Sequence, residues 1–173
     1  MLDFDVVVTK KGNINDLREA NKFTSHKESI MGLATAYHLG HSPIRTQEFK
    51  IEMLGIPTKC SVHFVRHSAV GQLHYVGTAR SDRTENKDSE VHRNTPVNHM
   101  MILNAEHLID MSRKRLCNTS DVDTVRIMHR IREEVRKVDP ALARYMQPDC
   151  VYRGGMCWQL NGSCGMYPVV ELK

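Results

Sequence analysis

The sequence predicts an α+β protein with a mixed sheet and long helices, folded as a single domain over residues 1–173. Apolar and β-branched residues recur at strand or helix spacing, and hydrophobic residues make up 40% of the chain, enough for a core. The expected strands span 4–9, 47–54 and 100–103, and the expected helices 15–39, 58–70, 104–116 and 120–138. Because these elements do not alternate regularly, a doubly wound parallel sheet is disfavoured.

The first expected helix, over 15–39, falls into two pieces. Its apolar face carries Ile30, Leu33, Ala34 and Tyr37, and Gly40 ends it. In the strand over 47–54 the apolar residues alternate with charged ones, which predicts a half-buried strand that ends at Gly55-Ile56-Pro57. Its inward side chains are Phe49, Ile51 and Met53.

The segment from Gly77 to Asn98 is rich in polar residues and predicts a long surface loop or a ligand-binding lid. Ser120 and Asp123 have the spacing of a capping box at the start of the last helix. Helical spacing predicts that its buried stripe is Val122, Val125, Met128, Ile131, Val135 and Val138. The glycine- and cysteine-rich tail from Gln147 predicts irregular structure.

Composition limits the classes of function. No apolar run is long enough to span a bilayer, and the acidic start does not have the pattern of a secretory signal. Five cysteines, an odd number, indicate reduced thiols and a cytoplasmic location. The formal charge of +4 suits an anionic small ligand such as a nucleotide. No block of Lys and Arg indicates polynucleotide binding.

Several common site motifs are missing from the sequence. It contains no G-x-G-x-x-G, no G-x-x-x-x-G-K-[ST] and no G-x-S-x-G, which disfavours a Rossmann dehydrogenase, a P-loop enzyme and an α/β-hydrolase. Cys150, Cys157 and Cys164 have six residues between neighbours and lack the close pairs of a zinc site. His63 and His67 lie four apart without the glutamate of H-E-x-x-H. We therefore predict no metal ligands.

Two short patterns can carry chemistry or can be purely structural. In Arg66-His67 the arginine offers a planar fork of donors and the histidine a tunable proton, which suits a flavin or a phosphate. Taken alone, the pair is explained better by a solvated basic helix end. Asn104 suits a helix N-cap, and Arg115 near a helix C-terminus is expected from the helix dipole.

In order along the chain, four stretches resemble the flavin-dependent thymidylate synthases. Together they span about residues 30 to 165. They are Gly40-His41-Ser42-Pro43 before the strand with Phe49, Cys60-Ser61-Val62-His63-Phe64-Val65-Arg66-His67, Leu103-Asn104-Ala105 followed by Arg115-Leu116-Cys117-Asn118, and the tail with Cys150-Val151, Cys157 and Ser163-Cys164-Gly165.

The resemblance implies a homotetramer that binds FAD and a pyrimidine nucleoside monophosphate between subunits. NADPH would reduce the flavin, and methylene-tetrahydrofolate would supply a carbon to C5 of the base. Arg115 would be the catalytic residue, because a guanidinium can stabilise negative charge developing on the ring. The implied cofactor-binding residues are Arg66, His67, Ser68, Asn104 and Glu106, and the implied substrate-binding residues are His63, His74, Arg80 and Arg83.

The chain departs from the family pattern at the same sites. Ser68 replaces the last residue of R-H-R, and the rest of that motif is rewritten. Glu106 replaces the arginine of N-A-R, and Thr46 stands where a histidine is usual. Arg80 or Arg83 could restore a phosphate contact if the loop carries an insertion. A carboxylate at Glu106 could favour a cytosine or ribose nucleotide over dUMP.

Three hypotheses follow from the sequence. The first is a flavin-dependent enzyme that methylates or hydroxymethylates C5 of a nucleotide such as dUMP, dCMP or UMP. The second is a non-catalytic relative that binds a nucleotide or flavin. The third is an unrelated α+β protein with a structural metal on its cysteine-rich tail.

Overall fold

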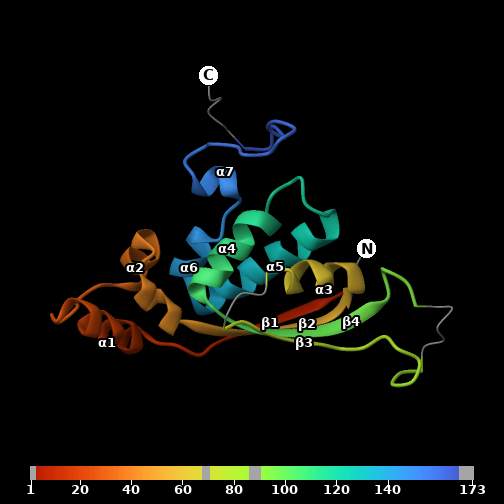
Figure 1. Ribbon diagram of the computed structural model, residues 1–173, viewed down its shortest axis with the longest axis horizontal. Helices are drawn as coiled ribbons and strands as arrows, with labels where there is room; N and C mark the ends of the chain where they lie inside the picture. Colours follow the sequence, from red (N-terminus) through yellow and green to blue (C-terminus); the bar gives the residue numbers. More distant parts are fainter. Residues whose placement is uncertain (1–2, 68–70, 86–90, 168–173) are drawn as a thin grey trace.

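The computed structural model describes residues 3–67, 71–85 and 91–167. At its centre is a four-stranded sheet in the order β1-β2-β4-β3, and the helices gather over one face of it (Figure 1). The strands are β1 (Asp5–Lys10), β2 (Glu48–Pro57), β3 (Leu73–Val76) and β4 (Pro96–Asn104). The α+β class is confirmed. All three strand pairings in the described residues are antiparallel, which corrects the expectation of a mixed sheet.

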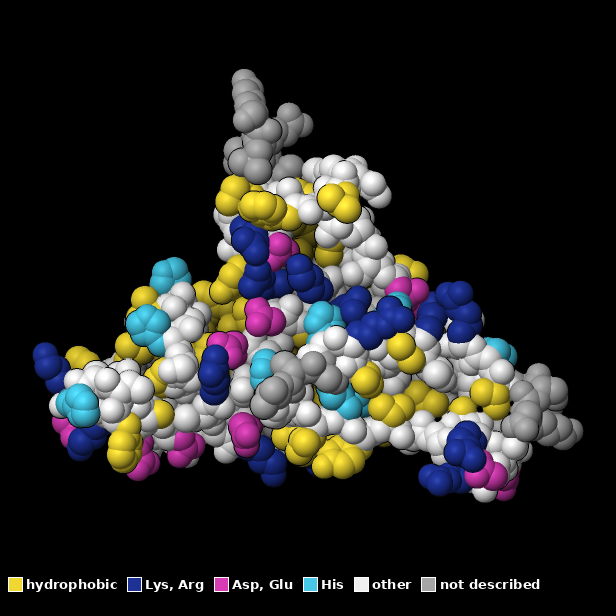
Figure 2. Space-filling model, in the orientation of Figure 1, with side chains coloured by type: hydrophobic (Ala, Val, Ile, Leu, Met, Phe, Trp, Pro, Cys, Tyr) yellow, Lys and Arg dark blue, Asp and Glu magenta, His cyan; other side chains and the backbone are white. Residues whose placement is uncertain are grey.

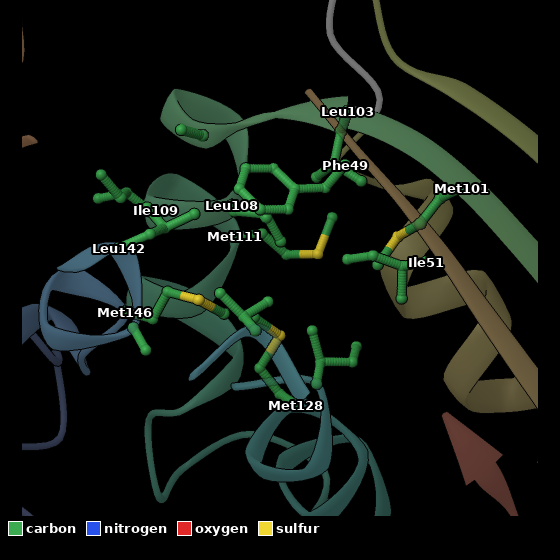
Figure 3. Close-up of a cluster of buried hydrophobic side chains, with 14 of the residues drawn as sticks. Phe49, Ile51, Met101, Leu103, Leu108, Ile109, Met111, Met128, Leu142 and Met146 are labelled. Atoms are coloured by element: carbon green, nitrogen blue, oxygen red, sulfur yellow. The ribbon is translucent and has the colours of Figure 1, made fainter. Parts of the chain in front are cut away.

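The core lies between the sheet and three helices: α4 (Ala105–Arg115), α5 (Val122–Val138) and α6 (Pro140–Tyr145). The predicted inward face of β2 is confirmed, because Phe49, Ile51 and Met53 are all fully buried. Figure 3 shows side chains of β2 and β4 pointing toward helical methionines such as Met111 and Met128. Each such side chain contributes about 1.5–3 kcal/mol when it leaves water.

β2 continues three residues beyond its predicted end. Its register against β4 shifts between Met53 and Ile56, where a bulge absorbs Gly55. Gly55 has a φ of 75°, a conformation that few other residues adopt, and its N–H donates to the Asn98 side chain at 3.1 Å. The glycine that appeared to end the strand therefore bends it.

The segment between 77 and 98 was predicted to be a long loop, but a strand takes up its last residues. β4 already begins at Pro96, and the short strand β3 over 73–76 was not predicted. β3 pairs with β4, and the N–H of Gly77 extends the ladder by donating to the Asn98 carbonyl at 2.7 Å. Four residues carry too little periodicity to reveal a strand without its partner.

The two predicted helical pieces near the N-terminus are α1 (Ile14–Ser25) and α2 (Leu33–Leu39). Gly40 caps α2 with a φ of 63°, so the predicted stop is confirmed. The predicted apolar face is wrong in part: Ile30 is 93% exposed and precedes α2, while Ala36 and Tyr37 are buried. Ile30 lies between the two helices, so the 3.6-residue period of α2 does not extend to it.

The turn before α1 approaches the short 3-10 helix η1 (Ser42–Thr46) closely. A Cβ on Gly12 would lie 2.2 Å from the Thr46 carbonyl oxygen, so only glycine fits there. The Asn13 side chain then caps α1 by accepting from the N–H groups of Asn15 and Asp16.

Two further boundaries differ from the prediction. α3 (Thr58–Val65) ends five residues before the predicted end at Val70. The N-cap of α5 is Asp121 and not Ser120, because the Asp121 carboxylate accepts from the Thr124 N–H at 3.1 Å.

The buried stripe of α5 is rotated relative to the prediction. Val122 and Val138 are 60% and 40% exposed, whereas Thr124 and Ile127 are buried. Met128, Ile131 and Val135 are buried as predicted. The tail contains the one-turn helix α7 (Asp149–Tyr152), and its remainder up to Tyr167 is irregular, as predicted. Of the described helices, none combines the length and apolar character of a membrane span.

Candidate functional site

The C-terminal ends of α3 and α4 meet at a basic cluster. The Arg115 guanidinium in the last turn of α4 donates from Nη2 to the backbone carbonyl of His63 on α3, at 3.0 Å. This bond satisfies a carbonyl near the helix end and fixes the arginine in a half-buried position. Its Nε atom is buried and has no hydrogen-bond partner. A buried donor without a partner is costly, so Arg115 is equipped to receive an acceptor from outside the chain.

His63 faces the start of α5. Its Nδ1 lies 2.8 Å from the buried hydroxyl of Thr124, which fixes the orientation of the ring. Burial, followed by the positive charge of Arg115, lowers the pKa of His63. The imidazole is therefore neutral at pH 7 and can accept or donate a hydrogen bond without adding charge.

His67 lies in the turn that follows α3, where its N–H donates to the Phe64 carbonyl at 3.0 Å. Its ring Nε2 is buried without a hydrogen-bond partner. Burial, with the charges of Arg115 and Lys114 next in weight, lowers the pKa of His67 to about 4. Two unpartnered polar atoms, on His67 and Arg115, thus belong to one electrostatically coupled cluster.

The cluster has an excess of positive charge. Within the described residues, the side chains of Arg66, Lys114 and Arg115 form no ion pair with a carboxylate. Burial, with the charge of Arg66 second, lowers the pKa of Arg115. Figure 2 shows Lys and Arg side chains in a band across the middle of this face, with His side chains beside them. Such a field favours an anion, and an anion would relieve the repulsion.

A chain of side chains leads from His74 into the core. His74 Nδ1 lies 3.0 Å from His99 Nε2, and His99 Nδ1 lies 3.1 Å from the hydroxyl of Ser61. His99 is 1% exposed, and burial lowers its pKa to about 4. His74 also contributes to lowering the pKa of His67, so the His74 end of this series of side chains lies close to the basic cluster.

The structure separates Asn104 and Glu106 from this cluster. Both lie at the N-terminal end of α4, whereas Arg115 lies at its other end, about 15 Å away at 1.5 Å per residue. Asn104 caps the helix by accepting from the His107 N–H at 3.1 Å. Glu106 forms a two-point ion pair with Arg45, at 2.7 and 3.2 Å. Asn104 and Glu106 therefore do not form one cofactor site with Arg66 and His67 within a single chain.

Arg80 and Arg83 lie in the segment beyond the far end of β3, away from the turn after α3 (Figure 1). Arg80 is already paired with Asp82 through two contacts of 2.9 Å. The phosphate contact expected of Arg80 or Arg83 stays a prediction. Ser68 lies outside the described residues.

Three residues of the site were missed by the sequence analysis: His99, Lys114 and Thr124. The sequence signal for His99 was a lone histidine on the inward face of β4, between Val97 and Met101. A polar residue in such a position needs a buried partner. Nothing in the sequence indicated that Ser61 and His74 supply it.

Comparisons with known proteins agree on the fold. No protein-family model and no curated protein sequence matches the chain. Thymidylate synthase X from Helicobacter pylori, solved with FAD and dUMP, superposes with a TM-score of 0.65 at 11% identity, over 86% of this chain and 99% of that one. The UMP/dUMP methylase PolB from Streptomyces cacaoi, solved with 5-Br dUMP, superposes with a TM-score of 0.60 at 12% identity, over 83% of this chain and 94% of that one.

An antiparallel sheet covered on one face by helices, with a basic cluster where two helices end, defines an α+β protein with a candidate anion site. The fold is that of the flavin-dependent thymidylate synthases, as the sequence resemblance predicted. At 11–12% identity the shared property is the fold, and the chain is divergent in sequence.

Proposed function

We propose that the chain is a flavin-dependent enzyme that modifies C5 of a pyrimidine nucleoside monophosphate, with Arg115 as its catalytic residue. The observation that carries the proposal is the state of Arg115: one nitrogen is anchored to the His63 carbonyl, and another is buried and unpartnered among positive charges. A guanidinium held in this way is oriented before a substrate binds and has a free donor for it. Preorganised donors stabilise charge that develops on a reacting ring.

The residues present suit an anionic nucleotide better than they suit the whole predicted flavin site. Arg66, Lys114 and Arg115 bring positive charge without a carboxylate, and neutral His63 can hydrogen-bond to a base or ribose. Arg66 and His67 would hold part of the FAD, and reduced flavin would supply the hydride that completes the new C5 substituent. Within this chain Glu106 is neutralised by Arg45, so its carboxylate brings little net repulsion to an anionic cofactor.

Asn104 and Glu106 would meet Arg66 and His67 only across a contact between copies of the chain. The bare face of the sheet supports such an assembly (Figure 1). Leu54, Leu73 and Tyr75 are 46%, 49% and 53% exposed there. An apolar patch on an uncovered sheet is typical of an interaction surface. The homotetramer, NADPH and methylene-tetrahydrofolate are parts of the proposal because the resemblance to the flavin-dependent thymidylate synthases implies them.

The test is a titration of purified protein with FAD, followed by absorbance after excess flavin is removed, and then by turnover assays. Retained flavin that NADPH reduces, and that is then reoxidised on addition of dUMP, dCMP or UMP with methylene-tetrahydrofolate, supports the enzyme. Retained flavin or nucleotide without turnover favours a non-catalytic binding protein. If the protein binds neither FAD nor any pyrimidine nucleotide, both the enzyme and the non-catalytic binding protein are excluded.

The substrate is decided by the same assay. The Glu106 carboxylate could accept from an exocyclic amino group, which would favour dCMP over dUMP. Equal turnover of the two nucleotides would contradict a switch of substrate at Glu106. Glu106→Gln should remove any preference for the cytosine nucleotide if the carboxylate creates it, whereas Glu133→Gln on the exposed face of α5 should not.

A further inference from the structure

The hydroxyl of Thr124, in the first turn of α5, lies between a carboxylate and a ring nitrogen. It is 3.2 Å from Asp121 Oδ1 on one side and 2.8 Å from His63 Nδ1 on the other. Thr124 is fully buried, so bulk water does not compete for the hydroxyl. Because a hydroxyl has a single hydrogen to donate, only one of the two neighbours can receive it.

The surroundings of Asp121 show that its carboxylate can only accept. Lys59 Nζ donates to Oδ2 at 3.0 Å, and the Thr124 N–H donates to Oδ1 at 3.1 Å. The Cys60 thiol adds a weaker donor, 3.8 Å from Oδ1. Burial raises the pKa of Asp121, but the hydrogen bonds from Lys59 and Thr124 outweigh burial and lower this pKa to about 2. An ionised carboxylate has no hydrogen to give, so the Thr124 hydroxyl donates to it.

We propose that Asp121 and Thr124 are positioning residues that fix His63 as the tautomer with its hydrogen on Nδ1. The Thr124 oxygen, having given its hydrogen to Asp121, accepts from His63 Nδ1. In a neutral imidazole only one nitrogen carries hydrogen, so Nε2 is then a bare acceptor. If the hydroxyl donated to Nδ1 instead, its oxygen would face the carboxylate with no hydrogen between them. An unmade hydrogen bond at a buried site is costly, so that arrangement is disfavoured.

The tautomer determines what the His63 ring can bind. Within the described residues, His63 Nε2 has no hydrogen-bond partner, while the His63 carbonyl accepts from Arg115. A bare Nε2 accepts from an N–H or O–H group and gains nothing from phosphate oxygens, which are themselves acceptors. The identity of the ligand rests on the proposed function, in which the chain binds a nucleotide. His63 then contacts a neutral donor of that nucleotide, either a base N–H or a sugar hydroxyl, and the anionic part binds the basic cluster around Arg115.

Nitrogen NMR of the full chain measures the tautomer without a ligand. With ¹⁵N-labelled histidine at about pH 7.5, above the ordinary pKa of histidine, long-range proton–nitrogen spectra separate a protonated ring nitrogen from a bare one. His63→Gln identifies the His63 signals among those of the ten histidines. We expect the hydrogen on Nδ1 in the unmodified chain. A hydrogen on Nε2 there would overturn the proposal.

Thr124→Val removes the hydroxyl but keeps the shape of the side chain and the N–H that Asp121 caps. We expect this variant to lose the preference for Nδ1–H, and Thr124→Ser to keep it, because serine retains the hydroxyl. Thr24→Val is the matched control, since the Thr24 hydroxyl is exposed on α1 and donates to the Asn21 carbonyl at 2.9 Å. It should leave the His63 signals unchanged. A Thr124→Val chain with the same His63 signals as the unmodified chain would also overturn the proposal.

Two analogues of dUMP distinguish the ligand donors that His63 could receive. 3-Methyl-dUMP lacks the base N–H, and 2′,3′-dideoxyuridine monophosphate lacks the sugar hydroxyl. In calorimetric titrations with FAD present, one of them should bind the unmodified chain about 2–10-fold more weakly than dUMP, the range of one neutral hydrogen bond. In Thr124→Val this difference should shrink, whereas a steric effect of the added methyl group would persist. Undiminished differences, or two analogues that bind as well as dUMP, would overturn the contact between His63 and a ligand donor.

The two kinds of measurement fail separately. If His63 carries its hydrogen on Nδ1 and no pyrimidine nucleotide binds, the proposed function is overturned, while the positioning of His63 by Thr124 is supported. If nucleotides bind and turn over but His63 carries its hydrogen on Nε2, the proposed function stands and the positioning role of Thr124 is overturned.

Discussion

Arg115 Nη2 donates to the carbonyl oxygen of His63 at 3.0 Å and thereby ties the end of α4 to α3. The same guanidinium keeps its buried Nε unpartnered. The anchor and the free donor are on one planar group, so the orientation of the donor is set by the fold before a ligand arrives. Lysine cannot combine these two properties, because its ammonium is not a planar fork.

Arg115→Lys and Arg115→Ala should both lower kcat. Removal of one preorganised donor to a developing anion typically costs about 10²–10³-fold in kcat. We expect the alanine variant to fall in that range and the lysine variant to recover only part of the loss. The measurement is steady-state turnover of the preferred nucleotide. Arg136→Ala, an exposed arginine paired with Glu133 on α5, is the control and should keep full activity. An Arg115→Ala enzyme with unchanged turnover would exclude the catalytic role.

Stability should decrease below about pH 6.5. Burial lowers the pKa of both His67 and His99 to about 4, whereas an unfolded histidine titrates near 6.5. Between these pH values the unfolded chain binds a proton that the folded chain does not. The free energy of unfolding is therefore fully present above about pH 6.5 and falls as pH drops toward about 4, by up to about 1.4 kcal/mol per pH unit for each histidine.

Urea unfolding at a series of pH values measures this slope. In His99→Gln the amide can still hydrogen-bond to Ser61 but does not titrate. The slope of the free energy of unfolding against pH should therefore decrease by the contribution of about one bound proton. His26→Gln is the control, because His26 caps α1 on the exposed side of the fold. Identical slopes for His99→Gln and the unmodified chain would show that His99 does not contribute to acid sensitivity.

The buried Asp139 joins three parts of the fold. Its carboxylate accepts from the Tyr37 hydroxyl at 2.7 Å, from Lys10 Nζ at 2.7 Å and from the Leu142 N–H at 2.9 Å. Tyr37→Phe removes one hydrogen bond to a charged group and should cost about 1.5–3 kcal/mol. Asp139→Ala leaves Lys10 without its partner and should cost more, about 3–5 kcal/mol.

Chemical denaturation measures both losses. Glu133→Ala breaks an exposed ion pair with Arg136 and should change the free energy of unfolding by less than about 1 kcal/mol. If Asp139→Ala is no more damaging than Glu133→Ala, the buried network does not stabilise the packing of β1 and α2 against α6.

Glu106→Gln should strengthen FAD binding if Glu106 borders the flavin in the assembled protein. The substitution removes a negative charge and frees Arg45, which currently forms the ion pair. The cost in stability should stay below about 1 kcal/mol, since such partly exposed pairs are weak. A FAD titration against the unmodified chain provides the comparison. Unchanged affinity would place Glu106 away from the cofactor.

The fold class, the main helices and the inward face of β2 could be predicted from the sequence, because side-chain spacing in long elements reports which face is buried. β3 and the first half of β4 could not be predicted, since a four-residue strand is defined by the partner it pairs with. The buried stripe of α5 was predicted only in part, because the spacing of apolar residues does not reveal that the polar Thr124 is buried.

From the sequence alone Arg66, His67 and Arg115 could be predicted as candidate site residues, since their types and order resemble a known family. The tertiary structure decided how these residues lie relative to one another. The contact of Arg115 with His63 spans 52 residues and that of His74 with His99 spans 25, and no local pattern encodes such distances. The fold also placed Glu106 at the opposite end of α4, because a helix of 11 residues keeps its two ends apart.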